Sequence, residues 1–170
     1  DMSLHFSDYR SGERTFQLVT QVSGRSGRAE EKGKVVLQTY DPENYILRFA
    51  AENDYKGFFE HEISLRKATA FPPFAKIVRV MVTAEDDKRA LETLREVWFS
   101  LKELYESEQE EFLFFNKMRA PVKRIQNRYR YQVLMRLKSD KLLPEIYGRS
   151  VPRSSREVLV YVEEDPGNLS

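Results

Sequence analysis

The stretch AFPPFAKIVRVMVTA, residues 70–84, contains the two signals that divide this chain. Pro72 and Pro73 end any helix before them, because proline lacks a backbone donor and pushes the preceding residue into an extended conformation. The following KIVRVMVTA alternates in hydrophobicity and predicts a β-strand. We therefore predict a domain boundary at this point, with one domain over residues 1–70 and a second over residues 71–170.

After this strand the pattern predicts five more elements. A long amphipathic helix is predicted for DDKRALETLREVWFSLKELYES, with one apolar face formed by Ala90, Leu94, Val97, Leu101 and Leu104. Strands are predicted for EFLFFNKM, RYRYQVLMRLK and EVLVYVEED, and a short helix capped by Ser139 or Asp140 for SDKLLPEIYGRS. The order β-α-β-β-α-β is typical of a ferredoxin-like α+β domain.

Before the prolines the chain predicts a helix, a strand and further helices. The first helix runs from about Gly12 to Gly27, with an apolar stripe of Phe16, Val19 and Val22. A short buried strand is predicted for GKVVLQTY, whose apolar content is nearly continuous, as in a parallel sheet. Helices are predicted for DPENYILRFAAEN, with Asp41 as its N-cap, and for DYKGFFEHEISLRKA. One strand cannot complete a sheet, so this part is predicted to be an incomplete α/β unit.

Composition excludes several classes of protein. The chain of 170 residues has a net charge of +1, no cysteine and two histidines. Disulfides and thiolate metal sites are therefore excluded, and no metal site is predicted. No apolar run approaches the ~18 residues of a membrane span, so we expect a soluble, cytoplasmic protein without a membrane partner.

The segment TQVSGRSGR, residues 20–28, places two glycines inside the first predicted helix. Gln21, Arg25 and Arg28 fall on one helical face, at positions i, i+4 and i+7. Gly24 and Gly27 leave space beside the arginines, whose planar guanidinium groups suit phosphate oxygens. The pattern predicts a contact with the phosphates of a nucleotide bound elsewhere, as an arginine finger makes. The alternative is a surface helix with two solvated arginines.

The sequence QVSGRSGR resembles motif VI of the superfamily 2 helicases. The longer run ERTFQLVTQVSGRSGRAEEKGKVVLQTYDPENY resembles the primosomal protein N′ family of bacterial replication-restart helicases, and the resemblance continues through AFPPFAKIVRV and NRYRYQVLMR to Asp165 and Pro166. It implies that residues 1–70 are the tail of a second RecA-like lobe. It also implies that Arg25 and Arg28 contact ATP phosphates, and that Gln21 couples this contact to the opposite lobe.

The same resemblance implies cofactors and partners for an intact protein. ATP and Mg²⁺ would bind between two lobes, and a zinc site would lie upstream. This chain has no GxxxxGK[ST] phosphate loop, so alone it should bind none of these cofactors and hydrolyse no ATP. The implied partners are single-stranded and forked DNA, single-strand-binding protein and other primosome proteins.

A second candidate site is a run of cations without any acidic residue. We define this basic segment as Lys117, Arg119, Lys123, Arg124, Arg128, Arg130, Arg136 and Lys138. In the predicted strand, Tyr131, Val133, Met135 and Leu137 alternate inward, which would leave Arg128, Arg130, Gln132, Arg136 and Lys138 on the opposite face. Such a face could follow a phosphate backbone while Tyr129 stacks on a base.

Three alternatives stay open at this point. The cations could form a merely solvated sheet face. The chain could be a stand-alone ferredoxin-like module that binds nucleic acid or docks an acidic protein. It could also belong to another superfamily 2 translocase that shares motif VI.

Overall fold

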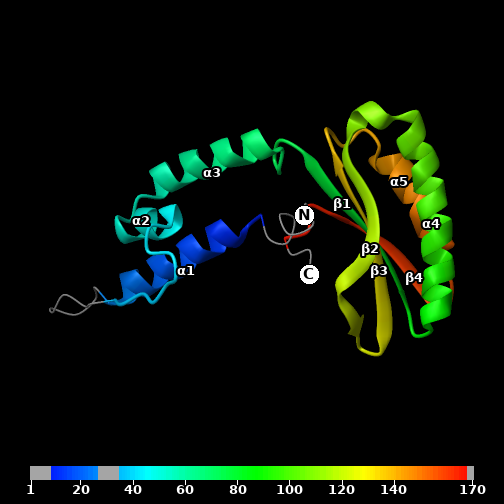
Figure 1. Ribbon diagram of the computed structural model, residues 1–170, viewed down its shortest axis with the longest axis horizontal. Helices are drawn as coiled ribbons and strands as arrows, with labels where there is room; N and C mark the ends of the chain where they lie inside the picture. Colours follow the sequence, from blue (N-terminus) through cyan, green and yellow to red (C-terminus); the bar gives the residue numbers. More distant parts are fainter. Residues whose placement is uncertain (1–8, 27–34, 168–170) are drawn as a thin grey trace. The chain divides into compact units, whose positions relative to one another are not determined.

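The structure, a computed structural model, describes residues 9–26 and 35–167 (Figure 1). It divides into two compact units, Asp1–Thr69 (unit 1) and Ala70–Ser170 (unit 2). Unit 1 contains helices only among its described residues, whereas unit 2 contains a four-stranded sheet with two α-helices and two short 3-10 turns. The predicted α+β class is confirmed.

Unit 1 consists of α1 (Ser11–Ser26), α2 (Tyr45–Ala51) and α3 (Tyr55–Thr69). Its buried centre joins all three helices through Phe16, Val19, Ala50 and Phe58. The rings of Phe16 and Phe58 stack with their centroids 4.3 Å apart. The helical pattern of the sequence therefore predicts correctly that Phe16 and Val19 are buried.

Three predictions for unit 1 are wrong. Val22 is 46% exposed, because the core ends with Val19. The described part of GKVVLQTY, residues 35–40, forms no strand, and Val36 is 80% exposed. A strand needs a neighbour to pair its backbone groups, and the described residues of unit 1 provide none. The N-cap of α2 is Asn44 rather than Asp41: its side chain accepts a hydrogen bond from the Ile46 amide at 3.0 Å.

Unit 2 contains the predicted elements in the predicted order. They are β1 (Lys76–Ala84), α4 (Asp87–Ser107), β2 (Phe112–Ile125), β3 (Arg128–Leu137), α5 (Leu143–Ser150) and β4 (Val158–Glu164). The strand order is β2-β3-β1-β4, and every neighbouring pair is antiparallel. Since β3 lies between β1 and β2, and β1 between β3 and β4, the sheet consists of two interlocked split βαβ units. The ferredoxin-like order is thus confirmed.

Both α-helices of unit 2, α4 and α5, lie on the same side of the sheet (Figure 1). The buried face of α4 is formed by Ala90, Leu94, Val97, Leu101 and Leu104, as predicted. It packs against the inward residues of β3, which are Tyr131, Val133, Met135 and Leu137. Asp86 caps α4 by accepting a hydrogen bond from the Arg89 amide at 2.8 Å. The helical period of α4 and the alternation of β3 therefore determine which side chains form this buried layer.

Three details of unit 2 differ from the predictions. β1 is buried on both faces rather than one, and as a central strand it pairs with β3 on one edge and β4 on the other. β2 extends to Ile125, whereas the sequence pattern predicts its end near Met118; its pairing with β3 continues into the hairpin. α5 begins at Leu143 without a side-chain cap, and the Ser139 hydroxyl instead accepts a hydrogen bond from the Lys141 amide at 3.3 Å.

Candidate functional site

The motif predicted to contact phosphates lies at the end of α1. Gln21 and Gly24 are exposed in the last turns of this helix, which continues through Arg25 to Ser26. The structure does not describe the side chain of Arg25. Gly27 and Arg28 also lie outside the described residues. A Cβ added at Gly24 would meet no described atom within 4 Å. Packing within the described residues therefore does not explain why position 24 is a glycine, which costs a helix about 1 kcal/mol relative to alanine.

The cations of the basic segment lie on both faces of the sheet. Directly paired residues of neighbouring strands share a face. Lys117 pairs with Val133, on the helix side, and its ammonium lies 4.9 Å from the Trp98 ring centroid. Arg136 pairs with Ile77 on the opposite side. The strand register therefore places cations of the basic segment on opposite faces of the sheet.

The opposite side of β3 is not the open basic face that the alternation predicts. Gln132 is only 1% exposed, and Arg130 and Arg136 are half-buried. The Arg136 guanidinium lies 5.3 Å from the Phe71 ring centroid, and burial lowers the pKa of this side chain. The prediction that Gln132 faces solvent is wrong, because β3 lies between two strands and both of its faces are covered along the middle of its length.

The β2–β3 hairpin presents two cations in a fixed arrangement. Gln126 and Asn127 form the turn with φ of 48° and 64°, the positive values that a tight two-residue hairpin requires. The Arg124 guanidinium donates a hydrogen bond to Asn127 Oδ1. Lys123 and Arg124 also lie over the Tyr129 ring, 5.8 and 4.9 Å from its centroid. The ring predicted to stack on a base is thus already in contact with two cations.

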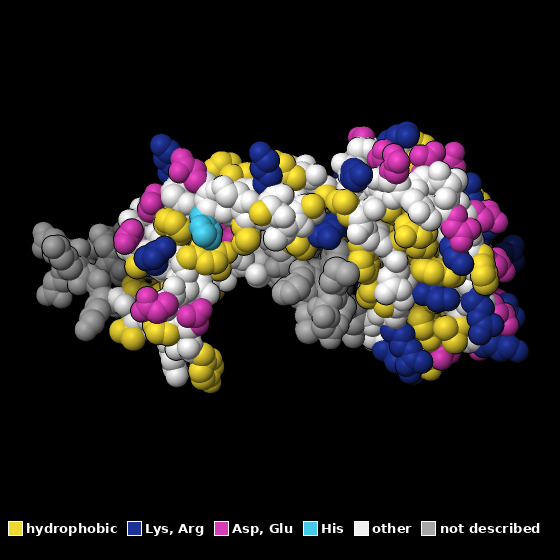
Figure 2. Space-filling model, turned by 45° about the horizontal axis from the view of Figure 1, so that its top comes forward, with side chains coloured by type: hydrophobic (Ala, Val, Ile, Leu, Met, Phe, Trp, Pro, Cys, Tyr) yellow, Lys and Arg dark blue, Asp and Glu magenta, His cyan; other side chains and the backbone are white. Residues whose placement is uncertain are grey.

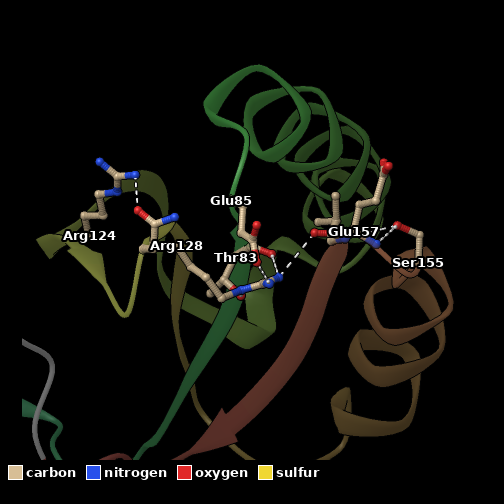
Figure 3. A network of polar contacts seen from close by, with 8 residues as sticks. Thr83, Glu85, Arg124, Arg128, Ser155 and Glu157 are labelled. Carbon is tan, nitrogen blue, oxygen red and sulfur yellow. Dashed lines mark hydrogen bonds and ion pairs between the residues drawn. The ribbon is translucent and has the colours of Figure 1, made fainter.

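Arg128 is bound to the sheet rather than presented to solvent (Figure 3). Its Nη2 donates to the Thr83 carbonyl oxygen at 2.9 Å and to the Glu157 carbonyl oxygen at 3.2 Å. Its Nε donates to Thr83 Oγ1 at 3.2 Å, and its Nη1 lies 3.9 Å from Glu85 Oε1. Arg128 therefore joins β3 to β1 and to the residue before β4, a role that sequence reasoning missed.

A pocket of about 300 Å³ lies beside Arg128. Its lining contains three acidic and three basic side chains, which are Glu85, Asp86, Arg89, Arg128, Arg156 and Glu157. Arg89 and Glu157 form an ion pair across it. Because the charges of the lining balance, this pocket does not favour a polyanion.

Four exposed cations remain together on the edge strand of the sheet. We call Lys117, Arg119, Lys123 and Arg124 the basic edge. Figure 2 shows Lys and Arg side chains interspersed with hydrophobic ones over part of unit 2. Between Arg119 and Arg124 the pairing with β3 shifts, and Pro121 lies in this irregularity. Cations and proline on an edge strand also prevent pairing with other sheets, so the pattern has a structural interpretation as well.

Lys138, the last cation of the basic segment, is exposed beyond the end of β3. Its backbone amide donates a hydrogen bond to the Glu111 carbonyl oxygen at 2.9 Å. Within the two described ranges, no three His, Cys, Asp or Glu side chains converge as metal ligands. Among the same residues, no helix has the length and apolarity to span a membrane.

Comparisons with known proteins relate both units to one family. Residues 67–167 match the model of the family described as the primosomal protein N C-terminal domain. The replication restart protein PriA of Bacillus subtilis strain 168 is 34% identical over 158 residues, which cover 93% of this chain and 19% of the relative. The protein of the same name from Borreliella burgdorferi is 31% identical over 165 residues, 97% of this chain and 24% of the relative. The chain thus spans about a fifth of the length of these relatives.

Proposed function

The chain belongs to the primosomal protein N C-terminal domain family, and from this membership we propose that it is the C-terminal part of an ATP-dependent DNA helicase acting in replication restart. Two of its relatives are named replication restart protein PriA and are about four to five times as long. Unit 1 would be the tail of a RecA-like lobe, and unit 2 a domain that contacts DNA or protein partners. In the cell the protein would be cytoplasmic.

The nucleotide would bind to a part of the longer protein and meet this chain at α1. Arg25 and Arg28 would contact the ATP phosphates and stabilise charge in phosphoryl transfer, with Gln21 beside them. The observation that supports this role is the glycine at position 24, exposed on a helix and uncrowded by described atoms. Gly24 and Gly27 would let the phosphates approach the helix closely. ATP, Mg²⁺ and zinc would be held outside this chain, which should not hydrolyse ATP alone.

Unit 2 would contact DNA through the basic edge. Phosphate contacts need exposed cations, and Lys117, Arg119, Lys123 and Arg124 meet this requirement better than the half-buried Arg130 and Arg136. Single-stranded and forked DNA are the proposed nucleic acids. Single-strand-binding protein and other primosome proteins are proposed partners of the intact protein.

The nucleotide role is tested in the full-length protein with Arg25→Ala and Arg28→Ala. Loss of a transition-state cation should lower ATP turnover by about 10³-fold or more while the melting temperature stays unchanged. Arg48→Ala, which removes an exposed arginine from α2, is the matched control and should keep normal turnover. Normal turnover in both motif variants would refute the phosphate assignment.

A further inference from the structure

A half-buried polar network fixes the first turn of α1 against α3. The Arg66 guanidinium of α3 reaches Glu13 in that turn, with its Nη2 2.6 Å from Glu13 Oε1. The same nitrogen donates to the Tyr9 carbonyl oxygen at 3.2 Å, and the guanidinium lies 5.3 Å from the Tyr9 ring centroid. The Arg66 side chain is only 12% exposed, so these contacts are poorly screened by water.

Glu62 of α3 connects α2 to this network. Its Oε2 lies 3.7 Å from Arg66 Nε, and its Oε1 accepts a hydrogen bond from the Tyr45 hydroxyl of α2 at 2.6 Å. Burial and this hydrogen bond raise the pKa of Tyr45. A Cβ added at Gly12 would come within 2.8 Å of Glu62 Oε1, so glycine at this position lets the carboxylate approach the start of α1.

These contacts are directional, unlike the apolar packing of Phe16 on Phe58. Apolar contacts resist separation of α1 from α3 but allow small rotations and shifts. The hydrogen bonds from Arg66 Nη2 to Glu13 Oε1 and to the Tyr9 carbonyl oxygen restrict such movements, because a planar guanidinium donates in fixed directions. Since α1 is one continuous helix to Ser26, an orientation fixed in its first turn is passed on to its last.

We infer that Arg66 is a positioning residue that orients α1, and with it the end of this helix that contains Gln21 and Arg25, toward the nucleotide. This inference rests on the proposed function. Arg66 itself is distant in sequence from the motif, and its hydrogen bonds to Glu13 and to the Tyr9 carbonyl oxygen lie at the opposite end of α1. Its contribution would be to hold Arg25 and Arg28 in the geometry that phosphoryl transfer requires.

The test uses three variants of the full-length protein. Arg66→Lys keeps the charge but loses the fork, and Glu13→Gln keeps the shape of the side chain but loses its charge. Lys56→Met, which removes an exposed ion pair with Glu60 from the same helix α3, is the matched control. ATP turnover, KM for ATP and melting temperature are measured for each variant, together with Arg25→Ala.

Small misplacement of catalytic groups can lower a rate by about 100-fold. We therefore expect Arg66→Lys and Glu13→Gln to lower kcat by 10- to 100-fold with KM for ATP unchanged, when each is assayed well below its own melting temperature, and Lys56→Met to keep normal kcat. Unchanged kcat in both network variants would overturn the inference. A fall in kcat that disappears at temperatures well below the melting temperature of the variant would overturn it too, because it would indicate partial unfolding and a merely structural role. Normal turnover in Arg25→Ala would instead refute the proposed function.

Discussion

Arg128 Nη2 donates a hydrogen bond to the backbone oxygen of Thr83 at 2.9 Å, so a cation in the middle of the basic segment binds the sheet itself. Its neighbours in the β2–β3 hairpin, Lys123 and Arg124, remain exposed. Cations that look equivalent in sequence thus divide into structural and accessible ones.

We predict that Arg128→Met destabilises unit 2. The variant loses three hydrogen bonds and leaves the Thr83 and Glu157 carbonyl oxygens without this donor. Because the side chain is partly exposed, the expected loss lies at the low end for charged hydrogen bonds, about 1.5 kcal/mol. Trp98, the single tryptophan, lies in α4, so urea unfolding followed by its fluorescence reports on unit 2. A variant as stable as the original chain would contradict the structural role.

Lys123→Ala combined with Arg124→Ala should weaken binding to single-stranded DNA. If each cation neutralises one phosphate, the slope of log affinity against log salt should become shallower by about 1.4, which fluorescence anisotropy at several salt concentrations would measure. Lys88→Ala combined with Arg95→Ala removes two exposed cations from α4 and is the control for net charge.

An equal loss in both double variants would mean that only net charge matters and that the basic edge is not the DNA contact. No measurable binding by the original chain at low salt would favour the other hypothesis, in which the basic edge docks an acidic protein. Loss confined to the Lys123 and Arg124 variant supports the basic edge.

The apolar core of unit 2 should depend on buried rather than exposed residues of α4. Leu101 is fully buried, whereas Phe99, two residues earlier, is 61% exposed. Leu101→Ala should cost about 2–5 kcal/mol of unfolding free energy. Phe99→Ala should change it by less than about 0.5 kcal/mol. Urea unfolding monitored by circular dichroism checks both values, and similar costs would contradict the packing described above.

Stability should also depend on pH through Glu164. Lys76 Nζ lies 2.9 Å from Glu164 Oε2, and its hydrogen bond lowers the pKa of Glu164 below its ordinary value in the folded chain. The resulting stabilisation is complete above the unfolded pKa and is lost as pH falls through the folded one, because the unfolded chain takes up the proton first.

The measurement compares the original chain with Glu164→Gln. The difference in unfolding free energy should be largest near neutral pH and shrink as the pH falls through the lowered pKa of Glu164 in the folded chain. Glu92→Gln, at an exposed position of α4, controls for loss of one carboxylate. A difference that stays constant with pH would show that the contact with Lys76 does not stabilise the fold.

Much of unit 2 could be predicted from the sequence because its elements have clear periods. The five apolar residues of α4 and the alternation of β3 each indicate one buried face, and the prolines mark the start of β1. The predicted strand before Asp41 is wrong for a complementary reason. Apolar composition favours burial, but residues 35–40 lack a neighbouring strand among those described and so remain unpaired.

The candidate sites were predictable to different degrees. The positions of Gln21, Gly24 and Arg25 on one helix follow from the sequence, and the contact of Arg25 and Arg28 with phosphates stays a prediction. The network around Arg66 could not be predicted, because Glu13 and Arg66 are 53 residues apart and a surface interpretation fits each of them equally well. Arg128 also contacts residues that are distant in sequence, so the sequence pattern predicts it as a ligand-binding cation.

The sequence by itself determined the class of each element in unit 2, their order and the inward side of α4 and β3, since these depend on local periodicity. Only the tertiary structure decided which cations are accessible and which are bound internally. Hydrogen bonds and ion pairs form between groups that strand register and packing bring together. These contacts cannot be predicted from the separation of the residues along the chain.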